Sequence, residues 1–502
     1  MENIKLDWNS YIEKSVEAVS EGIVMLKNDN NALPISKDEK IAVFGRIQLN
    51  YYKSGTGSGG LVNVSKVVGI TEALLDEGAQ VNKKLLDTYT EWTATNRYDL
   101  GEGWGGEPWS QKEMPLDEGL VKEIADDTSK AIVIIGRTAG EEQDAKKEKG
   151  SYLLTDEEER MLSLVRQNFK SVIVLLNVGG IIDMSFVTKY NPDAVMYVWH
   201  GGMIGGIGTA KVLLGEVSPS GKLPDTIALN VEDYPAFEYF GDPDRNYYSE
   251  DIYVGYRYFE TFEPKKVMYP FGFGLSFTQF SFENVSVVDN DDSITFGIKV
   301  TNIGNVSGKE VVEAYAAAPQ GLLSKPARVL CGFEKTSLLA PGQSETLNIE
   351  IKFSDIASFD DLGVTGYRDC FVLEAGEYDF YIGADVRSAE KYATRVIDKL
   401  IVTEELSDAL APVVPFERMK ANKTPDGFKV EFENVPATFN PEVRRIEAEK
   451  LCDIEYSGDK GIKLLDVYNG EKSLEEFIAQ LSDYDLSCII RGEGMCSPRV
   501  TA

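Results

Sequence analysis

Four carboxylates stand close together in one loop of the sequence, directly after an apolar run at residues 131–136. They lie among lysines in RTAGEEQDAKKEKGSYLL and are Glu141, Glu142, Asp144 and Glu148. A carboxyl group that is desolvated at the end of a strand has a raised pKa and can act as a general acid. A solvated, salt-bridged surface loop is the alternative for a segment of this charge. The residue types alone do not choose among the four.

A second loop, after the apolar run at 41–45, is rich in glycine and reads RIQLNYYKSGTGSGGLVNV. It contains a G-x-G-x-x-G pattern at Gly55, Gly57 and Gly60. In a dinucleotide-binding fold the first glycine follows the strand directly and the third opens a helix, whereas residues 46–54 intervene here. The spacing therefore disfavours a nucleotide. Two interpretations remain: glycines folded tightly over a neighbour, or a loop whose backbone and Ser58 hydroxyl contact a ligand.

Other chemistries find little support in the residue types. One histidine, His200, cannot build a multi-histidine metal site, and no cysteine pair has zinc spacing. No G-x-S-x-G motif accompanies that histidine, which disfavours a Ser-His-Asp triad. We therefore expect neither a metal nor a cofactor. Aromatic residues in the polar, Gly-rich loops would either stack on a sugar or be buried at a domain seam; they are Tyr51, Tyr52, Trp104 and Trp109.

The elements that must position these loops alternate between strands and helices over residues 1–240. The strands are β-branched runs without polar alternation, at 41–45, 131–136, 171–179 and 194–199. Helices are predicted at 9–27 and 155–168, the second opened by Thr155 and Glu158 at capping-box spacing. The pattern predicts a mainly parallel sheet flanked by helices, an α/β sandwich. Ligands bind beyond the carboxyl ends of such strands, where both loops would lie.

The remaining sequence changes character in steps. Aromatic, glycine and proline residues at 241–280 indicate an inter-domain crossing. Short alternating runs with turn residues over 281–405 predict an all-β sandwich of seven strands. Residues 406–465 are mixed and punctuated by proline, which predicts a long connecting segment. The segment 466–502 begins an amphipathic helix.

The net charge and the composition limit the classes of ligand and partner that the protein can bind. The chain has 502 residues, too many for a single core, with 51 basic against 82 acidic residues and a net charge of -31. This acidity repels phosphate backbones and anionic lipid, so we expect no nucleic acid and no membrane as partner, whereas a neutral ligand is acceptable. The sequence has no signal-peptide or membrane-spanning pattern and five scattered cysteines. A cytoplasmic protein with reduced thiols is therefore expected.

Several longer motifs together resemble glycoside hydrolase family 3, the β-glucosidase family. They are EGIVMLKNDNNALPI, YYKSGTGSGG, AIVIIGRTAGEEQDAKKEKGSYLLTDEEERML, SVIVLLNVGGIIDM, GEVSPSGKLPDTIA and YPFGFGLSFTQF. The resemblance implies an α/β sandwich domain, a fibronectin type III-like domain and a (β/α)8 barrel. The order here is similar to the permuted branch of the family, in which the barrel comes last. Residues 466–502 would then be the start of that barrel.

The resemblance also implies a function and two site residues. Members are retaining exo-β-glycosidases without a cofactor, so a β-glucosidase acting on a β-glucoside or oligosaccharide is expected. Their acid/base glutamate matches Glu141 in the pair Gly140-Glu141, with Glu142 as a minor competitor. Ser58 matches the serine that contacts the sugar. The nucleophilic aspartate belongs to the barrel, so the chain would require that segment, from the same gene product or a second chain. A homo-oligomer is left open.

Two other functions compete with this interpretation. A non-catalytic carbohydrate-binding or scaffold protein that lacks the barrel would keep the same two domains. A dinucleotide-binding protein would use the Gly-rich loop differently and is the more distant alternative. Activity of the complete polypeptide on nitrophenyl glycosides separates the first of these from an enzyme.

Overall fold

The computed structural model describes residues 6–57, 60, 62–141, 143–406, 412, 414–425, 427–436, 443, 446 and 453–492. The chain divides into two compact units. One comprises Met1–Ser407 with Pro415–Val435, and the other comprises Asp408–Val414 with Pro436–Ala502. Among the described residues, no helix combines the length and the apolar character needed to span a bilayer.

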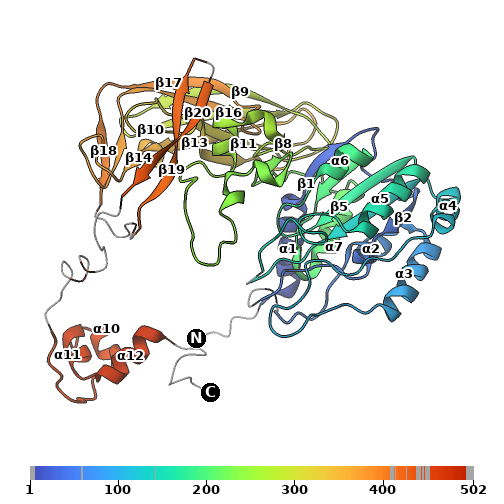
Figure 1. Ribbon diagram of the computed structural model, residues 1–502, viewed down its shortest axis with the longest axis horizontal. Coiled ribbons are helices and arrows are strands. Elements are labelled where there is room, and N and C mark those ends of the chain that lie inside the picture. Colours follow the sequence, from blue (N-terminus) through green and yellow to red (C-terminus); the bar gives the residue numbers. More distant parts are fainter. Residues whose placement is uncertain are drawn as a thin grey trace. The chain divides into compact units, whose positions relative to one another are not determined.

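A six-stranded sheet forms the centre of the N-terminal part of the first unit (Figure 1). Its order is β1 (Val24–Asn28), β6 (Ala194–Tyr197), β5 (Ser171–Asn177), β4 (Lys130–Gly136), β2 (Lys40–Phe44) and β3 (Gln80–Val81). All neighbours pair in parallel except β1 and β6. The four strands predicted from apolar runs are confirmed. Their residues are almost wholly buried because helices cover both faces of the sheet.

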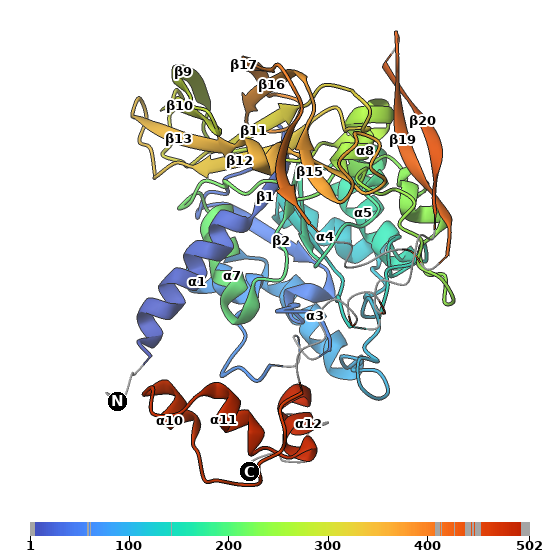
Figure 2. The same cartoon turned by 90° about the vertical axis from the view of Figure 1, so that its left-hand side faces the viewer.

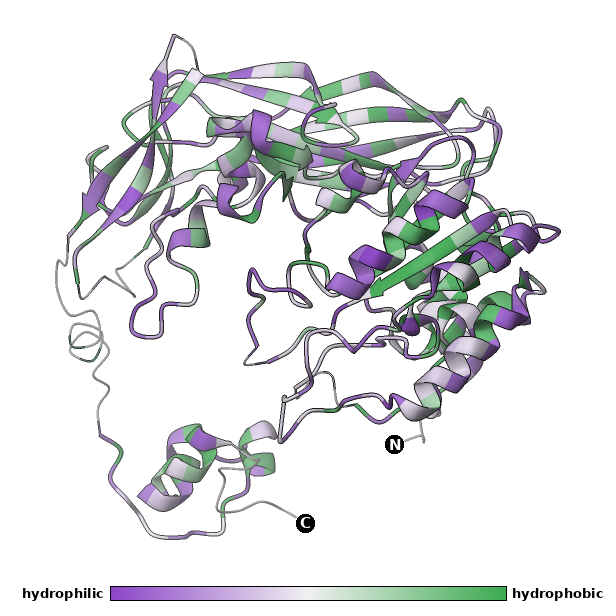
Figure 3. Ribbon diagram, turned by 45° about the vertical axis from the view of Figure 1, so that its right-hand side comes forward, coloured by the Kyte–Doolittle hydropathy of each residue, from purple (hydrophilic) through white to green (hydrophobic). Residues whose placement is uncertain are grey.

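The helices divide between the two faces. One apolar core joins the sheet to α1 (Trp8–Gly22), α2 (Ile70–Asp76) and α7 (Gly205–Leu213). The other core joins it to α3 (Lys83–Thr95), α4 (Glu118–Asp127), α5 (Asp156–Asn168) and α6 (Ser185–Tyr190). Figure 3 shows the apolar strands between helices that carry mixed polar and apolar faces. The predicted α/β sandwich is therefore confirmed.

One helix was predicted too long and another correctly. The helix expected at 9–27 ends at Gly22, and Val24–Asn28 forms the antiparallel edge strand β1. The run from Ile23 to Leu26 is buried at every position, which suits a strand between two cores and not a one-sided helix. The capping box is confirmed: Glu158 N donates to Thr155 Oγ1 at 3.1 Å and Thr155 N donates to Glu158 Oε2 at 2.8 Å.

A β-sandwich follows the α/β part. Its three-stranded sheet contains β13 (Ser344–Lys352), β10 (Ser293–Asn302) and β9 (Phe280–Asp289). Its four-stranded sheet contains β12 (Val329–Lys335), β11 (Val311–Ala317), β16 (Gly376–Gly383) and β17 (Glu390–Ile397). These sheets enclose one apolar core and confirm the predicted seven-strand sandwich. A further small sheet joins β14 (Ser358–Asp360), β15 (Cys370–Leu373) and β18 (Ile401–Glu405).

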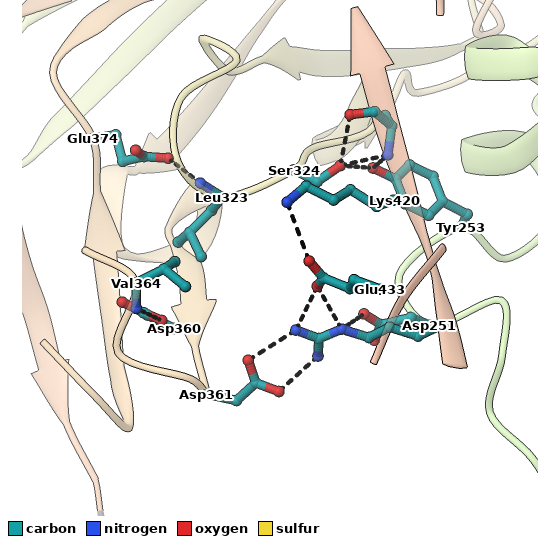
Figure 4. A network of polar contacts seen from close by, with 12 residues as sticks. Asp251, Tyr253, Leu323, Ser324, Asp360, Asp361, Val364, Glu374, Lys420 and Glu433 are labelled. Carbon is teal, nitrogen blue, oxygen red and sulfur yellow. Dashed lines mark hydrogen bonds and ion pairs between the residues drawn. The ribbon is translucent and has the colours of Figure 1, made fainter. Parts of the chain in front are cut away.

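The segment predicted as a long connection at 406–465 contains a β-hairpin, which the prediction did not include. Its strands are β19 (Phe416–Thr424) and β20 (Gly427–Val435), and β20 lies beside α8 (Tyr256–Phe262) (Figure 2). The Arg418 guanidinium fixes the hairpin. It donates to Asp361 at 2.6 and 3.0 Å and to Glu433 at 2.9 Å, and Figure 4 shows these two carboxylates converging with Asp251. Apolar side chains alternate along β20 at Phe428, Val430 and Phe432, so the pattern of a strand was present in this segment.

The second unit contains short helices in its described part. They are α10 (Leu464–Tyr468), α11 (Leu474–Ala479) and α12 (Asp483–Arg491). The single amphipathic helix expected after residue 466 is thus two helices, because Ser482 forms a capping box with Asp485 and starts a new one. The start of a barrel at 466–502 stays a prediction.

Candidate active site

The two loops of interest leave the same edge of the sheet. Strands β2 and β4 are parallel neighbours, with Phe44 opposite Val133, so their carboxyl ends lie side by side. The Gly-rich loop leads from β2 to α2, and the carboxylate-bearing loop leads from β4 to α5. The sheet therefore brings together the segments that the sequence separates by more than eighty residues.

The base of the carboxylate-bearing loop is fixed by a buried ion pair. Arg137 is 1% exposed and donates to Glu158 Oε1 and Oε2 at 2.6 and 2.7 Å. The same guanidinium donates to the carbonyl groups of Ser151 at 2.8 Å and Leu153 at 3.2 Å, at the far end of the loop. One side chain thus closes the loop on itself and joins it to the first turn of α5.

The tip of this loop lies against the Gly-rich loop. Thr56 N donates to the carbonyl of Ala139 at 2.5 Å, and Thr56 forms a parallel bridge with Gly140. A Cβ placed on Gly57 would lie 2.6 Å from Glu141 Cβ and 3.0 Å from its Oε2. Gly57 also has a φ of +87°, which only glycine adopts without strain. The glycine therefore permits the contact that places Glu141 at this edge.

A third segment supports the tip from residues 105–109. The Gln143 amide donates to the carbonyl of Gly105 and, at 3.0 Å, to the carbonyl of Glu107. Thr138 N donates to the carbonyl of Trp109 at 2.9 Å. The Thr138 main chain on one side of Glu141 and the Gln143 side chain on the other thus restrain the segment that carries this exposed carboxylate.

The other charged residues of the loop face solvent. Asp144 and Glu148 are exposed, Lys147 forms an ion pair with Glu232, and Lys149 pairs with Asp156 at 2.5 Å. Among the described carboxylates of the loop, Glu141 is the one in contact with the Gly-rich segment. The predicted site residue Ser58 and the competitor Glu142 lie outside the described residues.

His200 supports the loop and has no catalytic geometry. Its Nε2 lies 2.9 Å from the carbonyl of Arg137, and its ring lies 6.2 Å from that of Tyr52. Burial lowers the pKa of His200, although the hydrogen bond to the carbonyl opposes this. The ring is therefore neutral at pH 7 and packs under the base of the loop.

Two buried polar residues were missed by the sequence analysis. Asn177, at the end of β5, accepts from Tyr52 N at 2.9 Å and donates to the carbonyl groups of Tyr52 at 3.0 Å and Trp199 at 2.6 Å. Glu113 accepts from the main-chain N–H of Arg46 at 2.8 Å and Met114 at 2.7 Å. Burial raises the pKa of Glu113 to about 7. Asn177 could have been found as the polar residue that ends an apolar run.

The conformation of the Gly-rich loop bears on its dinucleotide pattern and on two of its aromatic residues. Helix α2 begins at Ile70, well after Gly60, so the third glycine does not open a helix and the dinucleotide pattern fails. Tyr52 is buried, and the Tyr51 hydroxyl accepts from Gly201 N at 3.0 Å. These two rings support the loop and are not a stacking platform, whereas Trp104 is exposed.

Two family models match the chain. Residues 23–277 match the glycosyl hydrolase family 3 C-terminal domain, and residues 310–386 match the fibronectin type III-like domain. The first match covers all strands of the six-stranded sheet and begins directly after α1, and the second lies within the β-sandwich.

Known proteins resemble the chain over nearly its full length. A "Beta-glucosidase" from Ruminococcus albus is 55% identical over 99% of this chain, and "Beta-glucosidase A" from Butyrivibrio fibrisolvens is 37% identical over 96%. The solved structure of a β-glucosidase from Paenibacillus barengoltzii is 47% identical and superposes with a TM-score of 0.95 over 100% of this chain. The chain spans 52%, 65% and 56% of the lengths of these three proteins.

Proposed function

The chain belongs to glycoside hydrolase family 3, and on this premise we propose that it supplies the acid/base part of a retaining exo-β-glucosidase. The observation that carries the proposal is the contact of Glu141 with Gly57, across the edge where β2 and β4 end. The names of the related proteins support a terminal β-D-glucosyl residue as substrate. We assign Glu141 as the acid/base residue and Ser58 as a sugar contact.

The proposed reaction needs two carboxyl groups about 5–5.5 Å apart. In the first step a nucleophilic carboxylate attacks the anomeric carbon, and Glu141 gives its proton to the departing glycosidic oxygen. In the second step the Glu141 carboxylate takes a proton from water, whose oxygen attacks the same carbon and releases the sugar. We place the nucleophile outside these 502 residues, since the relatives are much longer.

Chemical rescue tests this assignment in the complete polypeptide. A dinitrophenolate departs without protonation, so Glu141→Ala should still form the glycosyl-enzyme from a dinitrophenyl β-glucoside. Hydrolysis should then stall because no base activates water. Azide needs no deprotonation, and it should restore turnover and give a β-glucosyl azide of retained configuration.

Asp144→Ala is the matched control, because Asp144 is an exposed carboxylate three residues away. It should keep wild-type turnover and show no azide effect. Rescue in Glu142→Ala instead would move the assignment by one residue. Absence of rescue in all three variants would place the acid/base residue outside this loop.

The domain limits and the compartment are also proposals. We divide the chain into an α/β domain at 1–240, a crossing at 241–280, a fibronectin type III-like domain at 281–405, a connecting segment at 406–465 that includes the hairpin of β19 and β20, and the start of a barrel at 466–502. A cytoplasmic location is supported by Cys331, Cys370 and Cys488, which form no disulfide within the described part of the chain. Thiol titration of the denatured, unreduced protein should return five thiols; three or one would contradict it.

A further inference from the structure

One side chain connects the loop that carries Glu141 to the segment at residues 98–107. Gln143 follows Glu141 by two residues, and its amide nitrogen donates to the carbonyl groups of Gly105 and, at 3.0 Å, of Glu107. A primary amide nitrogen carries two hydrogens, so these two bonds use its full donor capacity. The half-buried side chain of Gln143 is therefore committed to this one neighbouring segment.

The segment that accepts these bonds is itself held by side chains. Asp99 N donates to Gln111 Oε1 at 2.7 Å, and the Gln111 amide donates back to the carbonyl of Asp99 at 2.8 Å. At the other end of the segment, the Tyr98 hydroxyl donates to the Glu107 carboxylate. These contacts fix the main chain on both sides of the carbonyl groups that Gln143 binds.

Glu141 lies between this segment and the Gly-rich loop. Its side chain contacts Gly57, whereas a Cβ placed on Gly105 would lie 3.5 Å from its carbonyl oxygen. Gly140, which precedes it, forms an antiparallel bridge with Gln143, whose N–H donates to the Gly140 carbonyl at 3.4 Å. Gln143 thus holds the main chain next to Glu141 with its own N–H and holds the neighbouring segment with its side chain.

We propose that Gln143 is a positioning residue for Glu141, which sets the place from which the carboxyl group reaches the departing oxygen. The inference rests on the proposed function and names the side chain through which that function is kept in register. A general acid must come within about 2.6–3.2 Å of the oxygen that it protonates. A displacement of about 1 Å can lower the rate about 10²-fold. An amide does not titrate, so Gln143 acts only through Glu141.

A displaced acid/base residue has an effect that depends on the leaving group. The value of kcat/KM reports the steps up to the departure of the aglycone in a retaining enzyme. The sugar that leaves from cellobiose must be protonated as it departs, whereas a dinitrophenolate departs without a proton. A loss of folded enzyme lowers kcat/KM equally for both substrates. The ratio of the two values therefore isolates the position of Glu141 from a general structural effect.

Gln143→Met in the complete polypeptide tests this role, because methionine has a similar length and no donor. We expect kcat/KM for cellobiose to fall by about tenfold to a hundredfold, and that for a dinitrophenyl β-glucoside to stay within about twofold of wild type. Gln167→Met is the matched control, since Gln167 is an exposed glutamine in α5 that bonds Ser163. It should leave both values unchanged.

The same change in the Glu141→Ala background separates this inference from the proposed function. Adding Gln143→Met should not alter the azide-rescued turnover of Glu141→Ala, because the group that it positions is gone. Absence of azide rescue in Glu141→Ala would overturn the assignment of Glu141 and, with it, the role of Gln143. If rescue is present, three results would overturn the role of Gln143 alone: equal losses for both substrates in Gln143→Met, no loss for either, or a further loss in the double variant.

Discussion

The base and the tip of the loop between β4 and α5 are built in different ways. At the base, Arg137 and Glu158 form a buried ion pair, and the guanidinium also donates hydrogen bonds to main-chain carbonyl groups at the far end of the loop. At the tip, Glu141 is exposed, and main-chain contacts of its neighbours with the Gly-rich loop hold it in place. The buried charges provide rigidity, while the carboxylate that would react stays where a substrate can reach it.

This difference separates two kinds of effect that mutations can have. Changes at the base should alter stability, because they leave charges or polar groups buried without a partner. Changes at the tip should alter the reaction and leave the fold intact. A residue such as Gly57, which joins the tip to the neighbouring loop, should show both effects in part.

The largest effect is expected at the tip, in Glu141→Gln of the complete polypeptide. Loss of general acid/base catalysis should lower kcat/KM for a nitrophenyl β-glucoside by about 10²–10⁴-fold. The side chain is exposed, so the free energy of unfolding should change by less than about 0.5 kcal/mol. Steady-state kinetics and chemical denaturation measure the two quantities. A large loss of stability would show that Glu141 has a structural role like that of the buried residues at the base of the loop.

The next largest effect is a loss of stability, expected when Arg137 at the base of the loop is replaced in Arg137→Met. This change leaves the Glu158 carboxylate buried without its cation and should destabilise the protein by about 3–5 kcal/mol in urea denaturation. The control is Lys149→Met, which removes an exposed pair with Asp156 in the same loop and should cost less than about 1 kcal/mol. Equal losses in the two variants would contradict the distinction between buried and exposed pairs.

A smaller effect is expected where tip and Gly-rich loop meet, in Gly57→Ala. The new methyl group would strain a backbone with φ of +87° and press on Glu141, at a combined cost of about 1–3 kcal/mol. Gly103→Ala separates these causes, because Gly103 has a φ of +77° and open space around it. Both variants should lose stability in thermal unfolding, but only Gly57→Ala should also lose turnover. Equal turnover in both would show that the Gly57 contact does not position Glu141.

The sequence allowed the meeting of the two loops to be predicted better than the buried polar contacts beneath them. Continuous apolar runs identified β2, β4, β5 and β6 because both faces of the sheet are covered, and the polar segments after them had to lie at one edge. Contacts such as Asn177 with Tyr52 and Glu113 with Arg46 join residues far apart in the chain. No local pattern encodes them, since tertiary packing decides which buried polar groups meet.

The same reason explains the errors in the fold. Gly22 ends α1 although the apolar pattern continues, because Val24–Asn28 finds a partner in β6, whose residues come much later. The hairpin of β19 and β20 is stabilised by Arg418 and its carboxylates and by an apolar cluster that its side chains form with Tyr253, a residue far away in the chain. The periodicity of apolar residues in a short segment does not show which distant strand the segment pairs with or which charged side chains it contacts.

The last effect, a dependence on pH, arises at Glu113, where the Gly-rich loop begins. Burial raises the pKa of Glu113 to about 7, against an ordinary value of 4.5. Between these values the folded protein binds a proton that the unfolded chain releases, so the free energy of unfolding falls as pH rises, by up to about 1.4 kcal/mol per pH unit. Above about pH 7 both states are ionised and this contribution is flat.

Glu113→Gln should reduce that slope, as measured by urea denaturation at intervals from pH 5 to pH 8. Glu313 in β11 is the matched control, because burial raises its pKa to about 7 as well, and Glu313→Gln should reduce the slope similarly. Glu113 accepts a hydrogen bond from Arg46, where the Gly-rich loop begins, whereas Glu313 contacts Tyr315 inside the β-sandwich. Only Glu113→Gln should therefore also change the pH profile of turnover near pH 7. If both variants or neither changed that profile, ionisation of Glu113 would have no specific connection to the position of Glu141.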